Sequence, residues 1–134
     1  MKFIVNFPAP QFKMDKLHSK SIGQKAEEIA CRFLLQQGLQ LLKKNYTSRY
    51  GEIDLILQDR HDVIFVEVRN RNRIDYGNAL ESVTKNKQKK IIRTAFCFLQ
   101  KNNLLNKINC RFDIIAIKNG KLEWIKNAFS LEYC

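Results

Sequence analysis

Two acidic residues, Asp54 and Glu67, have the type and spacing that metal-dependent chemistry requires. They lie in two apolar runs, residues 51–58 and 63–71, which are rich in Ile and Val and are separated by a short polar segment. Such a pattern predicts two antiparallel strands joined by a hairpin. The register that pairs the last residue of the first run with the first residue of the second places Asp54 directly opposite Glu67.

This pairing has an electrostatic cost. Directly opposed carboxylates destabilise a sheet, and two unit charges about 5 Å apart repel by about 3 kcal/mol at an effective dielectric constant near 20. A bound Mg²⁺ or Mn²⁺ ion would offset that cost because hard cations prefer carboxylate oxygens. A proton shared by the two acids would also do so. The ordinary alternatives are a solvated carboxylate at a sheet edge and a register that slips by one residue.

The same register predicts two faces with different roles. It places Glu52 opposite Arg69, on the face that carries Asp54 and Glu67. The opposite face is predicted to be apolar and to cover a core, and it consists of Ile53, Leu55, Leu57, Ile64, Val66 and Val68.

A helix is predicted before these strands, from Ser21 or Gly23 to about Gln37, because apolar residues recur there at helical spacing. Glu27 lies at the edge of the apolar stripe, whereas Glu28 points towards water. Glu27 can therefore look inward towards the sheet. An acid near a helix N-terminus is also favoured by the helix dipole alone, which is the simpler explanation.

Arginines follow the second strand at alternate positions. If the strand continues, Arg69, Arg71 and Arg73 share a face with Glu67. Guanidinium groups match phosphate oxygens, so these side chains are candidates for a phosphate clamp. A solvated loop is the alternative.

A second helix is predicted from about Asn78 to Asn102, with an inner stripe of apolar residues. Lys87 falls on the inner side near the N-terminal end, where it could reach the acidic pair; a snorkelling lysine is the alternative. The outward-facing cations form a solvated face that is also suited to backbone phosphates, and they are Lys85, Lys89, Lys90 and Arg93.

The net charge of +11, from 24 Lys and Arg against 13 Asp and Glu, favours a polyanionic partner. We expect DNA rather than RNA. No run of 18 apolar residues is present in the sequence, which argues against a membrane-spanning helix, and we expect a cytoplasmic protein. The four cysteines are far apart and form no Cys-x-x-Cys pair, so they are predicted to be reduced thiols.

A last hairpin is predicted around Asn119-Gly120, a strong two-residue turn signal. Its register places Asp113 opposite Lys126 as a structural ion pair, and the aromatic ring of Phe129 is expected to pack on the sheet. Residues 1–20 lack a sustained period and are predicted to be a loosely held basic extension. Residues 21–134 then form a single domain with the order α-β-β-β-α-β-β and a mixed sheet.

These motifs resemble the YraN family of small bacterial proteins, which are regarded as endonucleases akin to Holliday junction resolvases and related to the PD-(D/E)xK nuclease superfamily. The resemblance covers about residues 21–130. The motifs that carry it are Gly23-x-x-x-Glu27-x-x-Ala30, Asn45, Gly51-Glu52-Ile53-Asp54-Leu55-Ile56, Phe65-Val66-Glu67-Val68-Arg69-x-Arg71, Val83-x-x-x-Lys87, Arg111-Phe112-Asp113 and Asn127-Ala128-Phe129.

The resemblance implies a restriction-endonuclease-like α-β-β-β-α-β core with an extra C-terminal strand. It also implies that Asp54, Glu67 and Glu27 match the acidic positions that collect a divalent metal. One position departs from the motif, because Arg69 stands where the superfamily has lysine. Arginine stays protonated, so Arg69 could stabilise a charged phosphate but could not act as a base.

The sequence therefore predicts a Mg²⁺- or Mn²⁺-dependent endonuclease that hydrolyses DNA, with branched DNA as one candidate substrate. Arg69 would stabilise charge, and Lys87 or Arg71 would hold the DNA backbone. Two alternatives stay open: a module of the same fold that binds nucleic acid without cleaving it, and an RNA-associated or partner-binding protein. A homodimer is expected only if the substrate is a DNA junction, because junction resolution needs two active sites.

Overall fold

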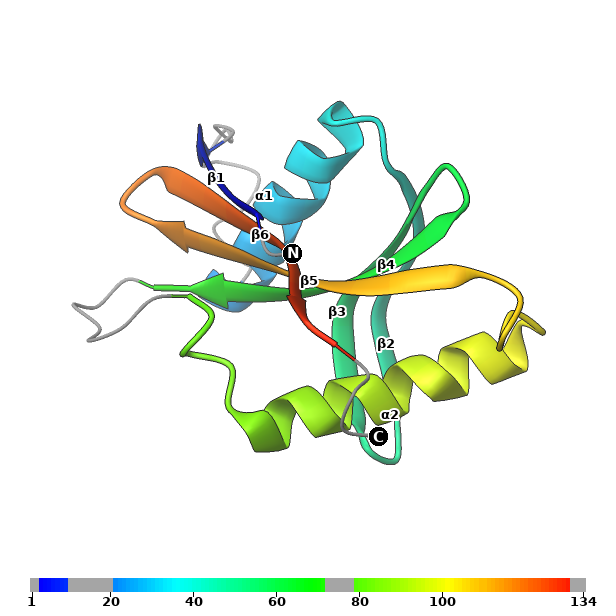
Figure 1. Ribbon diagram of the computed structural model, residues 1–134. Coiled ribbons are helices and arrows are strands. Elements are labelled where there is room, and N and C mark those ends of the chain that lie inside the picture. Colours follow the sequence, from blue (N-terminus) through cyan, green and yellow to red (C-terminus); the bar gives the residue numbers. More distant parts are fainter. Residues whose placement is uncertain (1–2, 10–20, 72–78, 131–134) are drawn as a thin grey trace.

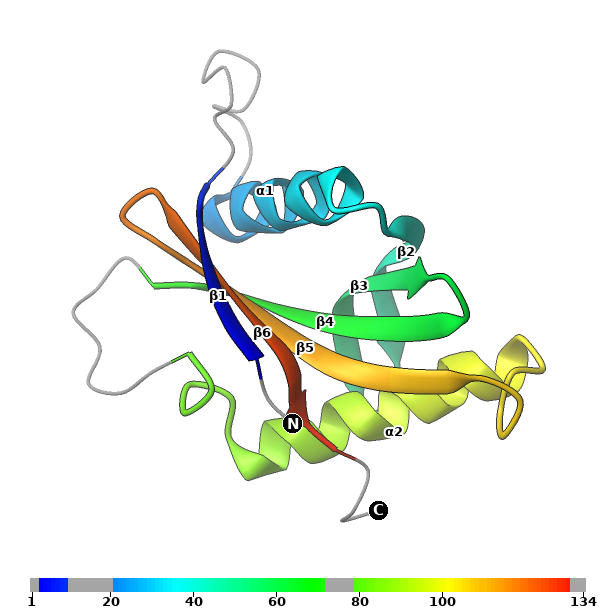
Figure 2. The same cartoon turned by 45° about the horizontal axis from the view of Figure 1, so that its top comes forward.

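A six-stranded mixed sheet lies between two helices in the computed structural model, which describes residues 3–9, 21–71 and 79–130. Helix α1 covers one face of the sheet and helix α2 covers the other (Figures 1 and 2). The sheet order is β1-β6-β5-β4-β3-β2. In chain order the elements are β1 (Phe3–Pro8), α1 (Ile22–Gln36), β2 (Gln40–Ser48), β3 (Gly51–Asp59), β4 (Asp62–Asn70), α2 (Lys85–Lys101), β5 (Asn109–Lys118) and β6 (Lys121–Phe129).

The predicted α/β class and the predicted order of elements after residue 20 are confirmed. Strands β4 and β5 pair in parallel, whereas the other neighbours are antiparallel. Parallel pairing requires a crossover between the two strands, and α2 supplies it. This architecture is consistent with the restriction-endonuclease-like core that the sequence predicted.

The N-terminus differs from the prediction. Residues 3–8 form β1, which pairs with β6 along its whole length from Phe3–Lys126 to Pro8–Lys121. The prediction of a loosely held extension was wrong for this segment, because backbone hydrogen bonding to a strand edge needs no sustained apolar period in the added strand. The rest of that predicted extension, residues 10–20, lies outside the described residues.

The register predicted for the central hairpin is confirmed from Leu55–Val66 to Gln58–Val63. Leu55 and Val66 pack in the core under α1, as the pattern predicted. Ile53 does not, because it packs on the α2 side of the sheet. The alternation of faces is therefore interrupted between Ile53 and Leu55, at the position of Asp54.

Both faces of the sheet are sealed by apolar packing. On the α1 side, Phe33 packs edge-on against Trp124, with ring centroids 5.7 Å apart. On the α2 side, Phe65 packs edge-on against Phe98 and stacks on Phe112, at 6.0 and 5.3 Å. Burial on both faces is typical of strands in the centre of an α/β sheet.

Helix α1 begins and ends where the sequence predicted. Ser21 caps its N-terminus by accepting a hydrogen bond from the Gln24 N–H at 3.2 Å, and the Gln24 side chain accepts one from the Ser21 N–H in return. Gly38 follows the helix with a φ of +95°, a left-handed conformation that favours glycine. The local signals therefore hold the helix that carries Glu27 in place.

Helix α2 begins later than predicted, at Lys85 rather than near residue 78. Thr84 is its N-cap and accepts a hydrogen bond from the Lys87 N–H at 3.2 Å. Ser82 bonds to the Ala79 carbonyl oxygen at 2.6 Å, which stabilises a turn instead of a helix. The first residue of the predicted helix, Asn78, lies outside the described residues.

The β5–β6 hairpin has the predicted turn and register from Lys118–Lys121 to Ile114–Ile125, but the register then shifts. Asp113 is fully buried and pairs with Arg111, with the carboxylate 3.0 Å from Nε, rather than with the predicted Lys126. It also accepts hydrogen bonds from the Trp124 indole and the Asn127 N–H, each at 2.9 Å. The shift coincides with the left-handed conformation of Asn127, whose φ is 54°.

The predicted packing of Phe129 on the sheet is confirmed. Phe129 stacks on Phe112 with ring centroids 5.1 Å apart. Cys31, Cys97 and Cys110 are free thiols, and Cys134 lies outside the described residues. Neither helix of the described chain has the length and apolar character needed to span a bilayer.

Replacing the buried carboxylate, Asp113→Asn, is expected to lower the free energy of unfolding by about 3 kcal/mol, because the Arg111 guanidinium would lose its counter-charge. Urea unfolding monitored by Trp124 fluorescence measures the change. The matched control is Asp59→Asn, which removes one of two opposed carboxylates in the Asp59–Asp62 pair and is expected not to destabilise the fold. Equal stability of wild type and Asp113→Asn would contradict the role given to Asp113.

Candidate functional site

Asp54 lies where β3 and β4 separate. Within the described strands, the ladder between them ends at Leu55–Val66, and the Asp54 carboxylate takes the place of the next backbone contact. Its Oδ2 accepts a hydrogen bond from the Val68 N–H at 2.8 Å. The backbone of β4 therefore fixes the position of the carboxylate.

Glu67 is almost fully buried, with 5% of its side chain exposed, and cations from two elements approach it. Lys87 Nζ of α2 lies 2.7 Å from Glu67 Oε1, which confirms that Lys87 reaches back to the acidic pair. Arg69 Nη1, two residues along β4, is 3.7 Å from the same oxygen. The predicted pairing of Glu52 with Arg69 is not made, because the ladder between the described strands β3 and β4 stops at Leu55–Val66.

Both acids resist ionisation, although Glu67 is buried and Asp54 only half-buried. Burial raises the pKa of Asp54 to about 7; the Val68 hydrogen bond opposes the rise, and a hydrogen bond with Glu27 adds to it. Burial also raises the pKa of Glu67 to about 7, with a further rise from the Asp54 charge and an opposing effect of Lys87. The repulsion inferred from the sequence is thus present, even though the two residues are not a ladder pair.

Glu27 reaches the same cluster from α1. It lies within hydrogen-bonding reach of Asp54. Asn45 of β2 joins it to a third acid when its amide is oriented to donate: the amide nitrogen is 3.2 Å from both Glu27 carboxylate oxygens and 3.0 Å from Glu52 Oε1. Asn45 has a φ of 50°, a left-handed conformation, and lies between the ladder pairs Lys44–Leu55 and Tyr46–Ile53.

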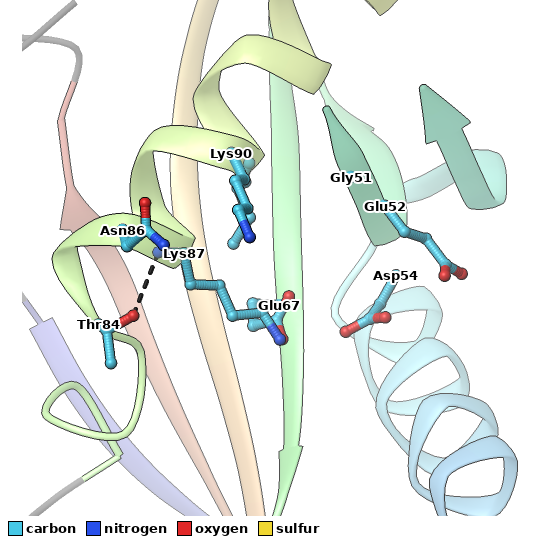
Figure 3. Close-up of a pocket in the computed structure, with 9 residues that line it drawn as sticks. Gly51, Glu52, Asp54, Glu67, Thr84, Asn86, Lys87 and Lys90 are labelled. Atoms are coloured by element: carbon cyan, nitrogen blue, oxygen red, sulfur yellow. Dashed lines mark hydrogen bonds and ion pairs between the residues drawn. The ribbon is translucent and has the colours of Figure 1, made fainter. Parts of the chain in front are cut away.

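A cavity of about 390 Å³ opens between the start of β3 and the start of α2. In Figure 3 the Asp54 carboxylate points towards Glu67, whereas the Glu52 carboxylate points away from it. Lys87 extends from α2 to Glu67, and the Lys90 amine is directed into the space beside them (Figure 3). The lining residues are Gly51, Glu52, Asp54, Glu67, Thr84, Asn86, Lys87, Lys90 and Ile91.

The described residues contain no group of three His, Cys, Asp or Glu side chains already arranged to hold a metal ion. What they offer is a pair of hard oxygen ligands, Asp54 and Glu67, with Glu27 beyond Asp54. A cation bound there would complete its shell with water or with oxygens of a substrate. Mg²⁺ commonly binds in this way, through one or two carboxylates and several waters.

Comparison with known proteins places these residues in a family. Residues 26–117 match the family described as "Uncharacterised protein family UPF0102". The chain belongs to the UPF0102 family. It is 46% identical over 116 residues to a UPF0102 protein of Coxiella burnetii strain RSA 331, an alignment that covers 86% of this chain and 97% of that protein.

Two further UPF0102 relatives have similar coverage. A protein of Saccharophagus degradans is 48% identical over 109 residues, which is 81% of this chain and 92% of that protein. A protein of Pseudomonas aeruginosa PAO1 is 42% identical over 121 residues, covering 86% and 97%. The UPF0102 match includes the Asp54 and Glu67 strands and the segments that carry Glu27 and Lys87.

The remaining basic residues of this UPF0102 chain are distributed differently. Arg71 is buried, with 8% exposed, and its N–H bonds to the Ile117 carbonyl oxygen at 2.9 Å, so the backbone continues along β5 past Asn70. Arg73 lies outside the described residues. The predicted solvated face is confirmed, because the side chains assigned to it are all exposed: Lys85, Lys89, Lys90 and Arg93.

Sequence reasoning missed two contributions to the site. Lys90 was assigned to the solvated face, yet it also lines the cavity, because the start of α2 lies close to Gly51. Asn45 entered only through the family resemblance. A polar residue inside an otherwise regular strand was the available signal, but its contacts with Glu27 and Glu52 depend on packing between α1 and β2.

The raised pKa values predict an unusual dependence of stability on pH. Between the ordinary value of 3.8 and about 7, folded Asp54 keeps a proton that the unfolded chain has released, so the stability of the metal-free protein falls as pH rises through that window. Asp54→Asn removes the buried charge and leaves an acceptor for the Val68 N–H. It is expected to raise the free energy of unfolding at pH 8 by about 2 kcal/mol, with the difference shrinking towards pH 4.

Urea unfolding in EDTA at several pH values measures this difference. The control is Glu52→Gln, which neutralises an exposed carboxylate at the rim of the cavity and is expected to change stability by less than about 0.5 kcal/mol at each pH. An Asp54→Asn protein that is no more stable than wild type at pH 8 would contradict the conclusion.

Proposed function

We propose that this protein is a divalent-metal-dependent endonuclease that hydrolyses phosphodiester bonds in DNA. The observation that carries the proposal is the pair of carboxylates of half-buried Asp54 and buried Glu67, each with a pKa near 7, which line an open cavity beside a lysine-rich helix. A site that raises two acids to this degree is more easily explained by function than by stability. The resemblance to PD-(D/E)xK nucleases supports the same reading.

The residues present fit a hard divalent cation. Mg²⁺ or Mn²⁺ would be held by the carboxylates of Asp54 and Glu67, with Glu27 supporting the position of Asp54. Bound there, the ion would polarise the scissile phosphate and lower the pKa of an attacking water. The charge of the ion would also relieve the repulsion between the two acids.

The chain's own groups have separate roles in this proposal. The Val68 N–H orients the Asp54 carboxylate. In the metal-free protein Lys87 forms an ion pair with Glu67. Once the acids bind a cation, the ammonium group of Lys87 would be released to contact a phosphate oxygen. Arg69, with 33% of its side chain exposed, stabilises negative charge that develops on the phosphate.

Nucleic acid is supported as the partner by charge. The protein carries a net charge of +11, and the exposed face of α2 presents several cations next to the cavity. No acidic residue lies in the first turn of α2, and its N-terminal residues Thr84 and Asn86 line the cavity, so the helix dipole favours an anion there. We propose DNA rather than RNA. A homodimer would be required only for a DNA junction.

Metal binding is the first test. Titration of wild-type protein with MnCl₂ in a calorimeter is expected to release or absorb heat, whereas Asp54→Asn and Glu67→Gln are expected to give none. Glu52→Gln, which changes an exposed acid at the same cavity, should bind as wild type does. No heat with the wild type would contradict the metal site.

Cleavage is the second test. Nicking of branched and linear DNA in Mn²⁺ or Mg²⁺ is expected for wild type and Glu52→Gln, with a fall of at least about 100-fold in Glu67→Gln. Binding of DNA to Glu67→Gln should persist, because the basic surface is unchanged. Equal cleavage by wild type and Glu67→Gln would indicate a contaminating nuclease and would contradict the proposal.

A second candidate function is a module that binds nucleic acid without cleaving it. Two observations favour it. Lys87 already balances Glu67 at 2.7 Å, so the site can persist without a metal, and Arg69 occupies the motif lysine position. Tight DNA binding with no cleavage in any divalent metal would support this module. Competition between structured RNA and branched DNA at about 150 mM salt would reveal an RNA-associated protein, because weak backbone contacts fade at that salt concentration.

A further inference from the structure

The turn between β2 and β3, residues 48–51, is fastened to α2. The hydroxyl groups of Ser48 and Thr94 are 2.9 Å apart, and the Thr94 hydroxyl also donates to the Lys90 carbonyl oxygen at 2.9 Å. The Tyr50 N–H donates to the Ser48 hydroxyl at 3.1 Å. The turn therefore has a fixed position on the helix, although it lies at the surface.

Two arginines from different elements converge on one aromatic ring at this turn. The Arg49 guanidinium lies 4.9 Å from the centre of the Tyr50 ring, and its Nη2 donates to the Tyr50 hydroxyl at 2.7 Å. The Arg93 guanidinium of α2 lies 5.8 Å from the same ring centre. We call these three residues the Tyr50 patch. Both arginines are exposed, and within the described ranges neither forms an ion pair with a carboxylate.

The Tyr50 patch adjoins the acidic cavity on two sides. Gly51, the next residue after Tyr50, lines the cavity, and so does Lys90, one helical turn before Arg93. A β-carbon at position 51 would lie 3.5 Å from Lys90 Cβ, so the turn and the helix are in close contact where they border the cavity. A chain of phosphates that enters the cavity can therefore continue over the patch.

We propose that the Tyr50 patch binds backbone phosphate of the nucleic-acid strand whose scissile phosphate lies between Asp54 and Glu67. This proposal adds a binding surface to the proposed nuclease site. It rests on the proposed function for the path of the nucleic-acid strand from the cavity to the patch. Guanidinium forks match phosphate oxygens, and the Tyr50 ring and hydroxyl hold Arg49 in place before the ligand arrives. Preorganisation of this kind reduces the entropy lost on binding.

A solvated arginine face would give a different pattern of binding. If an arginine only adds to the net charge, removing any other exposed arginine should weaken nucleic-acid binding equally. If the Tyr50 patch is a phosphate clamp, only the removal of its own arginines should weaken binding strongly. Arg60 supplies the comparison, because it is exposed and lies in the β3–β4 turn, at the opposite end of β3 from the Tyr50 patch. Its loss changes the charge by the same amount.

Binding is measured in EDTA, so that no cleavage is needed, with a fluorescein-labelled duplex and fluorescence anisotropy over a range of salt concentrations. Arg49→Ala and Arg93→Ala are each expected to weaken binding about 5- to 10-fold and to reduce the slope of log affinity against log salt by about one. Tyr50→Phe keeps the ring but loses the hydroxyl, and is expected to weaken binding about 2- to 3-fold through Arg49 alone. Arg60→Ala is expected to stay within about 2-fold of wild type.

Equal losses in Arg60→Ala and Arg49→Ala, or no loss in either patch variant, would overturn the proposal. Thermal unfolding confirms that each variant is folded, and none of the changed side chains is buried. The outcome is separable from the nuclease proposal. Patch-dependent binding without any cleavage would leave the patch standing and overturn the nuclease, whereas metal-dependent cleavage with an unchanged KM in Arg49→Ala and Arg93→Ala would do the reverse.

Discussion

Two neighbouring carboxylates, those of half-buried Asp54 and buried Glu67, constrain much of this molecule. Burial disfavours the charge on both residues, and the charge of Asp54 raises the pKa of Glu67 further. A backbone hydrogen bond from Val68 and the ammonium group of Lys87 oppose these effects. These groups come from β4 and α2, so the electrostatics of the cavity depend on the position of α2 against the sheet.

Much of the fold could be predicted because local patterns and tertiary packing agree. The alternation of apolar residues set the β3–β4 register, the Asn119-Gly120 turn set the β5–β6 register near the turn, and Ser21 with Gly38 delimited α1. The same agreement extends to the site. The apolar stripe of α2 has Lys87 on its inner side, and that is why the lysine meets Glu67.

Two of the failures involve asparagines with an unusual backbone. Asn45 and Asn127 adopt left-handed conformations, which few residues other than glycine accept. Asn45 accompanies the change of face between Ile53 and Leu55. Asn127 accompanies the register shift after which Asp113 pairs with Arg111 instead of Lys126. The sequence contains many asparagines, and nothing local distinguishes these two. Residues 3–8 were missed because strand addition at a sheet edge depends on β6.

The parallel pairing of β4 with β5 has a consequence for how the molecule assembles. The acidic hairpin is local in sequence, but Glu67 meets its lysine only after α2 has docked against the sheet. That docking is secured by a parallel strand pair whose partners are far apart along the chain, and contacts of this kind form slowly. During synthesis, the two acids therefore emerge from the ribosome before their compensating cation, and the cavity can be completed only after α2 has docked.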